Sequence, residues 1–198
     1  MQEKEERRSN ADRTQAMRDG LIASARELFI EKGYAETSTP EIVARANVTR
    51  GALYHHFEDK ASLFRAVITA ESERVAEAIN LATQDCTDAA DALNTGTDAY
   101  LDAMTVPGRT RLLLVDGPSA LGREVMDAID RETSGGTMVV GLTAALGRPA
   151  DTAIQAHASL LSAAFDRAAL DINAGGDASL YRMVLKKMLA EAVDANQA

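Results

Sequence analysis

The side chains with the clearest chemistry lie in residues 47–60, which read NVTRGALYHHFEDK. Arg50 carries a planar guanidinium that can donate two hydrogen bonds to O6 and N7 of guanine, and Thr49 can serve a phosphate or a base edge. Gly51 and Ala52 are small, so a helix that begins here can approach base pairs closely. This combination predicts direct contact with the edges of DNA bases.

Further polar side chains follow in the same segment. Tyr54 and His55 carry a phenol and an imidazole, and both can bond a phosphate oxygen at the groove wall. Lys60 adds a mobile positive charge there. Leu53 and Phe57 keep the spacing of a buried helix face, so they should anchor the other side of the segment in a core. An ordinary surface helix in an α-helical bundle is the alternative interpretation.

Neither metal chemistry nor catalysis is expected from this chain. His55 and His56 are adjacent, but neighbouring helical positions point about 100° apart and no cysteine joins them. The sequence has no Ser-His-Asp arrangement, no metal-ligand spacing and no phosphate loop. We therefore expect no enzymatic activity, no cofactor and no metal.

Two short helices should present the polar segment. Residues 38–46 form the first, because Ser38 stands three residues before Glu41 at the spacing of a capping box. Asn47 tolerates the turn that ends it. Thr49 can cap a second helix that reaches about residue 56. Two short helices joined by such a turn predict a helix-turn-helix over about residues 38–57, whose second helix lies in the major groove.

Helical signals also dominate the rest of the chain, and strand-like alternation is essentially missing. A first helix should cover residues 15–32 and stop at Gly33, and a fourth should start at Asp59. Gly117 and the pair at 135–136 should be breaks. The sequence therefore predicts an all-α protein, with later helices listed by range as 88–104, 149–173 and 178–195.

Charge is distributed unevenly over a chain of 198 residues with a net charge of −9. Residues 7–65 hold ten basic and eight acidic side chains, whereas residues 71–198 hold ten basic and nineteen acidic ones. This asymmetry suggests two different tasks. The single Cys86 excludes an internal disulfide, and no apolar run approaches the roughly 18 residues of a membrane span, so we expect a cytoplasmic protein.

Residues 15–68 resemble, without gaps, the N-terminal domain of the TetR/AcrR family of transcriptional regulators. Three motifs carry the resemblance: an F-x-x-x-G-Y turn, a T-S-x-x-x-I helix start and an L-Y-x-H-F-x-x-K signature. Their residues are Phe29, Gly33 and Tyr34, then Thr37, Ser38 and Ile42, then Leu53, Tyr54, His56, Phe57 and Lys60.

The resemblance implies a three-helix DNA-binding domain followed by a helical ligand-binding and dimerisation domain, about nine helices in all. We expect a flexible tail at residues 1–14, the DNA-binding domain at 15–75 and the second domain at 76–198. Arg7, Arg8 and Arg13 of the tail either enter the minor groove or stay solvated. The resemblance places Ser38 and Thr39 near phosphate and assigns most of the DNA surface to Thr49, Arg50, Ala52, Tyr54, His55 and Lys60.

Two departures from the family pattern stand inside the helix-turn-helix. Asn47 replaces the more usual glycine of the turn, which should be tolerable. Ala52 replaces a frequent Thr or Ser, so one polar contact to DNA is expected to be absent.

The second domain should hold a small-molecule cavity and a dimer interface. Candidate cavity residues are Tyr100, Met104, Asp116, His157 and Phe165, although each alone is more often simple core, and His157 is better explained by a bond to a neighbouring carbonyl. The last two helices carry too much apolar surface for one contact, and two-fold symmetry supplies a second. The expected interface residues are Leu160, Ala164, Ala168, Leu180, Val184 and Met188.

The expected function is that of a dimeric repressor that a small-molecule effector releases from double-stranded operator DNA. A ligand-independent or activating DNA-binding regulator is the nearer alternative. A helical small-molecule-binding protein without a DNA role is the alternative from another class.

Overall fold

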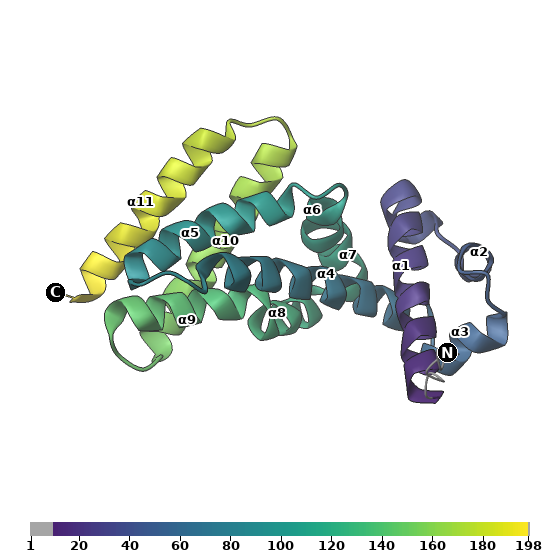
Figure 1. Cartoon of the computed structure of the whole chain (residues 1–198). Helices are drawn as coiled ribbons and strands as arrows, with labels where there is room; N and C mark the ends of the chain where they lie inside the picture. The colour runs from purple at the N-terminus through teal and green to yellow at the C-terminus, as the bar shows by residue number, and fades with distance from the viewer. Residues whose placement is uncertain (1–9, 198) are drawn as a thin grey trace, which may run out of the picture. The chain divides into compact units, whose positions relative to one another are not determined.

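The computed structural model describes residues 10–197, and every regular element in this part of the chain is a helix. Helices α1 to α11 follow one another (Figure 1). One π-helical segment lies between α6 and α7 in the chain. The prediction of an all-α protein is confirmed. More helices are present than the nine expected, because short helices such as α6 and α7 flank the π-helical segment.

The chain divides into two compact units between Val67 and Ile68. This boundary lies inside α4 (Lys60–Thr83), earlier than the one expected after residue 75. Glu71, on the later part of α4, is fully buried and forms an ion pair with Arg109 of the second unit. The part of α4 that follows Val67 therefore belongs to the second unit.

The first unit is built on α1 (Asn10–Glu36). Residues 10–14, expected in the flexible tail, form the start of this helix. Residues 1–9, with Arg7 and Arg8, lie outside the described residues. Gly33 has φ 83°, so the regular helix ends where a glycine stop was predicted. The buried hydrophobic residues of the unit are Leu21, Ile22, Ala25, Leu28, Phe29, Ile42, Leu53, Phe57, Leu63, Phe64 and Val67.

Local hydrogen bonds define the helix-turn-helix as the sequence predicted. Ser38 precedes α2 (Thr39–Arg45), and its backbone N–H donates to the Glu41 carboxylate at 2.9 Å. Asn47 has φ 52°, the left-handed conformation of the turn. Thr49 caps α3 (Arg50–His56), because its Oγ1 accepts a hydrogen bond from the Ala52 N–H at 3.1 Å.

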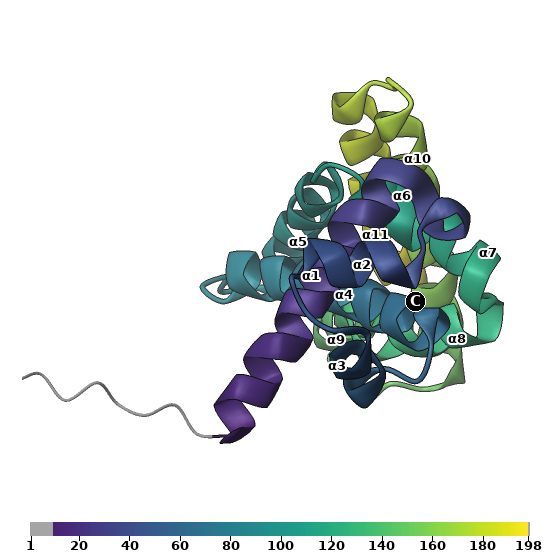
Figure 2. The same ribbon diagram turned by 90° about the vertical axis from the view of Figure 1, so that its right-hand side faces the viewer.

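The second unit continues from α4 through α5 (Ala89–Met104), α6 (Arg109–Arg111), the π-helical segment (Leu112–Asp116), α7 (Gly117–Leu121), α8 (Arg123–Glu132), α9 (Ser134–Leu146), α10 (Thr152–Asn173) and α11 (Ala178–Gln197). The loop between α10 and α11 lies at one end of both helices in Figure 1 and in Figure 2, so the two helices are antiparallel neighbours.

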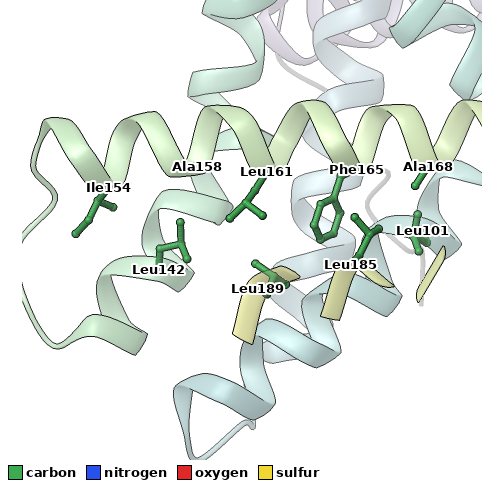
Figure 3. Close-up of a cluster of buried hydrophobic side chains, with 9 residues drawn as sticks. All are labelled: Leu101, Leu142, Ile154, Ala158, Leu161, Phe165, Ala168, Leu185 and Leu189. Atoms are coloured by element: carbon green, nitrogen blue, oxygen red, sulfur yellow. The ribbon is translucent and has the colours of Figure 1, made fainter. Parts of the chain in front are cut away.

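One face of α10 forms the centre of the second unit's core (Figure 3). Side chains from three other helices pack against it: Leu101 from α5, Leu142 from α9, and Leu185 and Leu189 from α11. The contributing residues of α10 are Ile154, Ala158, Leu161, Phe165 and Ala168.

Two predicted glycine breaks are wrong. Gly117 keeps helical angles and joins the π-helical segment to α7. A Cβ at Gly117 would lie 2.9 Å from the Leu112 carbonyl oxygen, so glycine permits a close approach there. Gly135 and Gly136 lie inside α9, and the break comes earlier, at Thr133, with φ −130° and ψ −116°.

Candidate nucleic-acid interface and ligand cavity

The polar residues of the helix-turn-helix lie on the surface of the first unit, while its apolar residues are buried. We call the following set the recognition surface: Ser38, Thr39, Thr49, Arg50, Gly51, Ala52, Tyr54 and His55. Five of these, Thr49, Arg50, Gly51, Tyr54 and His55, are exposed at α3, whereas Leu53 is fully buried and Phe57 is 5% exposed. The helix is therefore held from one side and open on the other.

Tyr54 connects the two helices of the motif. Hydrogen bonding with the Thr39 side chain, and then with Arg50, lowers the pKa of the Tyr54 phenol. The Arg50 guanidinium carbon lies 5.4 Å from the centroid of the Tyr54 ring. Thr39 on α2 and Arg50 on α3 therefore share one neighbour, which orients three polar groups together at the surface.

Charge pairs fix α2 against α1. Arg45 donates to Glu31 through two nitrogens, with Nη2 at 2.9 Å from Oε2. Lys32 pairs with Glu41, and together with the Ser38 bonds this lowers the pKa of Glu41 to about 2. Since the Ser38 hydroxyl donates to Glu41 at 2.7 Å, Ser38 serves the helix cap, and its contact with phosphate stays a prediction.

Lys60 does not carry the mobile charge that we expected. Its Nζ donates to the carbonyl oxygens of Tyr34 at 2.9 Å and Thr37 at 3.0 Å, and it lies 4.3 Å from the centroid of the Tyr34 ring. An ammonium has three donors, and here they point at backbone acceptors. Lys60 therefore ties the start of α4 to the end of α1, and the expectation of a mobile charge is wrong.

The second unit contains a cavity of about 880 Å³ between α4, α5, α8, α9, α10 and α11. Of the expected cavity residues, Tyr100 and Phe165 line it. Their rings pack edge to face with centroids 5.5 Å apart. The cavity thus has the size range of small-molecule sites, about 300–1,000 Å³.

The other three expected cavity residues do not line it. Met104 is 4% exposed and packs as core. Asp116 lies in the π-helical segment and pairs with Arg111 at 3.2 Å. His157 Nδ1 lies 2.9 Å from the Ala153 carbonyl oxygen, which is the alternative that the sequence favoured for this residue.

Two carboxylates that line the cavity, those of Asp130 and Asp166, were not among the expected residues. Asp166 accepts a hydrogen bond from the Tyr100 hydroxyl at 2.7 Å, and burial raises its pKa to about 6. Asp130 accepts from the Gly135 N–H at 2.9 Å, and burial raises its pKa as well. The sequence did contain a sign of Asp166, since this acid follows Phe165 directly in a helix otherwise rich in Ala and Leu.

The last two helices expose several large apolar side chains on the surface of the second unit. Leu160 is 73% exposed, Met183 61% and Leu180 50%. Val184 and Met188 belong to the same set, which we call the apolar face. Ala168 was expected in the interface, but it is 2% exposed inside the protomer's own core, so that expectation is corrected, and Ala164 packs against the same core.

Other kinds of site are not indicated in residues 10–197. No group of three or more His, Cys, Asp or Glu side chains in this range is arranged to hold a metal ion. Within the same range, no helix combines the length and apolar character needed to span a membrane.

Two family models match the chain. The one described as bacterial regulatory proteins, tetR family, matches residues 21–67, and the one described as tetracyclin repressor-like, C-terminal domain, matches residues 90–193. The first contains the helix-turn-helix and the second contains α10 and most of α11.

Curated relatives match over shorter stretches. The Transposon Tn10 TetC protein of Escherichia coli is 42% identical over 82 residues, which is 41% of each chain. The HTH-type transcriptional repressor BepR of Brucella suis is 39% identical over 62 residues, which is 31% of this chain and 29% of that protein. The chain thus spans less than half the length of these relatives.

Solved structures match over nearly the whole chain. A TetR-family transcriptional regulator from Pectobacterium atrosepticum has 32% identity and a TM-score of 0.65, covering 95% of this chain and 93% of that one. RolR in complex with resorcinol has 19% identity and a TM-score of 0.67, with 94% and 96% covered, and shares the fold. The family models and the Pectobacterium structure together show that this chain belongs to the TetR family of bacterial regulatory proteins.

Proposed function

We propose that the protein is a sequence-specific DNA-binding repressor that a small molecule releases from its operator. One observation carries the proposal: Thr49, Arg50 and Tyr54 are exposed at α3 and its N-cap, while Leu53 of the same helix is fully buried. A helix held in this way can enter the major groove and read base edges without losing its own packing. The family to which the chain belongs supports the same role.

A homodimer would provide two such helices. We propose that the apolar face of α10 and α11 pairs with the same face of a second copy across a two-fold axis. Two recognition helices would then reach half-sites about 34–36 Å apart on a pseudo-palindromic operator. Large exposed side chains such as Leu160 and Met183 support this, since they leave water only when another surface covers them.

The cavity supplies the means of release. We propose that an effector bound there favours a spacing of the two recognition helices that does not fit the operator. A hundredfold loss of DNA affinity requires only ~2.8 kcal/mol of coupling between the two sites. Because α4 contains residues of both units, and Glu73 and Glu77 line the cavity, α4 is the connection that would transmit the change.

The test begins with selection of bound duplexes from a random pool, followed by fluorescence anisotropy on the selected and a scrambled duplex. We expect at least a hundredfold preference for the selected duplex, lost on addition of the effector fraction of a cell extract. Equal affinity for both duplexes would refute sequence-specific binding. Unchanged affinity with every bound ligand would refute the release mechanism alone.

A second candidate is a DNA-binding activator. The HTH-type transcriptional activator FasR of Mycolicibacterium smegmatis is 30% identical over 96 residues, 48% of this chain and 44% of that protein. Transcription from a promoter that carries the selected site separates the two roles. Repression requires a lower transcript level when the protein is added, and activation a higher one.

A further inference from the structure

We propose that the cavity of the second unit binds a cationic, largely aliphatic amphiphile, with the cation beside Asp166 and the chain along the apolar lining. This proposal rests on the proposed function, in that the cavity is taken as the effector site. It adds the chemical class of the effector, which the fold alone does not define.

The size and the apolar part of the lining suit a flexible hydrocarbon chain. The cavity measures about 880 Å³ and is lined on several sides by aliphatic side chains. These include Ile79 of α4, Leu93 of α5, Met138 of α9 and Leu189 of α11. Transfer of each methylene group from water into such surroundings contributes about 0.8 kcal/mol, so a ligand with a long chain is favoured over a small polar one.

The charged part of the lining has one sign. Five acidic side chains line the cavity, and none of the Lys, Arg or His residues in the described range does so. The acids come from three helices: Glu73 and Glu77 from α4, Asp130 and Glu132 from α8, and Asp166 from α10. Glu73, Glu77 and Glu132 are exposed to solvent, which screens them, so the acids that matter most inside the cavity are Asp130 and Asp166. An anionic ligand would meet like charge there, while a cation would find opposite charge.

Asp130 is already bonded within the protein. Its Oδ1 accepts from the Gly135 N–H at 2.9 Å and from the Ser134 hydroxyl at 3.1 Å. A Cβ at position 135 would lie 2.1 Å from Asp130 Oδ2, so this approach requires glycine. Asp130 is thus held at the start of α9.

Asp166 is in a different position. Its Oδ1 accepts from the Tyr100 hydroxyl at 2.7 Å, which is a neutral donor. Burial, with a contribution from the charge of Asp130, raises the pKa of Asp166 to about 6. At neutral pH the group is therefore mainly ionised in surroundings that disfavour a charge, and a ligand cation would supply the opposite charge there.

The aromatic side chains favour an aliphatic ligand over a planar one. Tyr100 and Phe165 are the two aromatic residues of the lining, and their rings meet edge to face at an interplanar angle of 75°. They offer no parallel pair of faces between which a flat ligand could stack.

The test uses three ten-carbon probes that differ in head group: decyltrimethylammonium, decyldimethylamine oxide and decyl sulfate. The amine oxide has nearly the shape of the cation but no net charge. Isothermal titration calorimetry on the full chain, below the concentrations at which each probe forms micelles, gives Kd for each. We expect the cation to bind at least tenfold more tightly than the amine oxide, and the sulfate to bind most weakly.

Asp166→Asn should reduce the ratio of the two Kd values, amine oxide to cation, from at least tenfold to less than threefold. Asp194→Asn is the matched control, since it removes the same charge at an exposed residue of α11 outside the lining. Equal affinities of wild type for cation and amine oxide, tighter sulfate binding, or no binding of the cation at all would each overturn the proposal, whether or not Asp166→Asn folds.

The two proposals fail in different ways. If the cation binds as expected but leaves operator affinity unchanged, the ligand class stands and release by that ligand fails. If an extract fraction releases the operator while the cation binds no better than the amine oxide, the repressor mechanism stands and the ligand class fails.

Discussion

The Lys60 ammonium donates to the Tyr34 carbonyl oxygen at 2.9 Å and lies over the ring of the same residue. The Thr37 carbonyl oxygen accepts from the same nitrogen. These carbonyls follow Gly33, where the regular part of α1 ends, so they have no partner in a continuing helix. The charge of Lys60 is thus used to hold the end of α1 against the start of α4.

Lys60→Met should lower the free energy of unfolding by ~1.5–3 kcal/mol, because hydrogen bonds to charged groups contribute about that much. Urea denaturation followed by circular dichroism measures it. Arg65→Gln, which removes a charge from an exposed position of α4, is the control and should change stability by less than about 0.5 kcal/mol. If Lys60→Met kept wild-type stability but bound all duplexes more weakly, a direct phosphate contact would replace this interpretation.

Arg50→Ala should cost ~1–3 kcal/mol of operator affinity and relax the sequence preference, because a bidentate contact to one base is lost. Anisotropy on the selected duplex and on single-base variants measures both effects. Arg13→Ala is the control, because Arg13 is exposed in α1. Any loss of DNA affinity in this variant should be similar for all duplexes. Uniform weakening by Arg50→Ala would show that this side chain contacts phosphate.

Arg109→Met should destabilise the second unit by about 3–5 kcal/mol. Arg109 Nε donates to the fully buried Glu71 carboxylate at 2.9 Å, and Nη1 donates to the Ala103 carbonyl oxygen at 2.7 Å. Removal of Arg109 leaves a buried charge without its main partner. Arg74→Gln is the control, because Arg74 is a half-exposed partner of the same Glu71 carboxylate. This variant should lose less than about 1 kcal/mol of the free energy of unfolding. Equal losses in the two variants, measured by urea denaturation, would contradict this account.

The dimer proposal predicts that Leu160→Asp gives a monomer. Leu160 is 73% exposed, so the charge costs the isolated protomer little but would be desolvated in a two-fold interface. Analytical ultracentrifugation measures the molecular mass of the variant in solution. Its operator affinity should be lower than that of the wild type, because a monomer provides one recognition helix and not two. Val115→Asp, at a residue of the π-helical segment that is 50% exposed, is the control. A Leu160→Asp protein that remained dimeric would place the interface elsewhere.

The helix-turn-helix could be predicted from sequence because its signals are local. The capping box at Ser38, the left-handed Asn47 and the cap at Thr49 each act within a few residues, and each is present in the structure. The family motifs added the same assignment independently. Lys60 was misjudged because its acceptors, the carbonyls of Tyr34 and Thr37, lie more than twenty residues away in the chain.

The cavity could not be predicted in the same way. Its acids come from separate helices, so only packing brings Asp166 near Tyr100, 66 residues earlier in the chain. The two glycines at 135–136 looked like a break, yet both lie inside α9, where the Gly135 N–H donates to Asp130 and the lack of a Cβ permits that close approach. A periodic pattern of Ala and Leu does not distinguish Ala168 in the core from Leu160 on the surface, because both suit an apolar helix.

Asp166 makes stability depend on pH with a definite sign. Its pKa is raised from 3.8 to about 6 by burial, and the neighbouring groups are Tyr100 of α5 and Asp130 of α8. Between these two values the folded protein holds the proton more tightly than the unfolded chain. The contribution of Asp166 to stability is therefore full below about pH 4 and is lost as pH rises through about 6.

Asp166→Asn keeps the size of the side chain and an oxygen that accepts from Tyr100, but it cannot ionise. The variant should be more stable than wild type by ~1–3 kcal/mol at pH 7.5, and the difference should vanish near pH 4. Urea denaturation of both proteins at the two pH values measures this. Asp194→Asn, at an exposed residue outside the cavity, is the control and should not be stabilised at pH 7.5. A variant less stable than wild type at pH 7.5 would mean that the ionised carboxylate stabilises the fold and already has its counter-charge within the protein, which would also remove the reason for a cationic ligand.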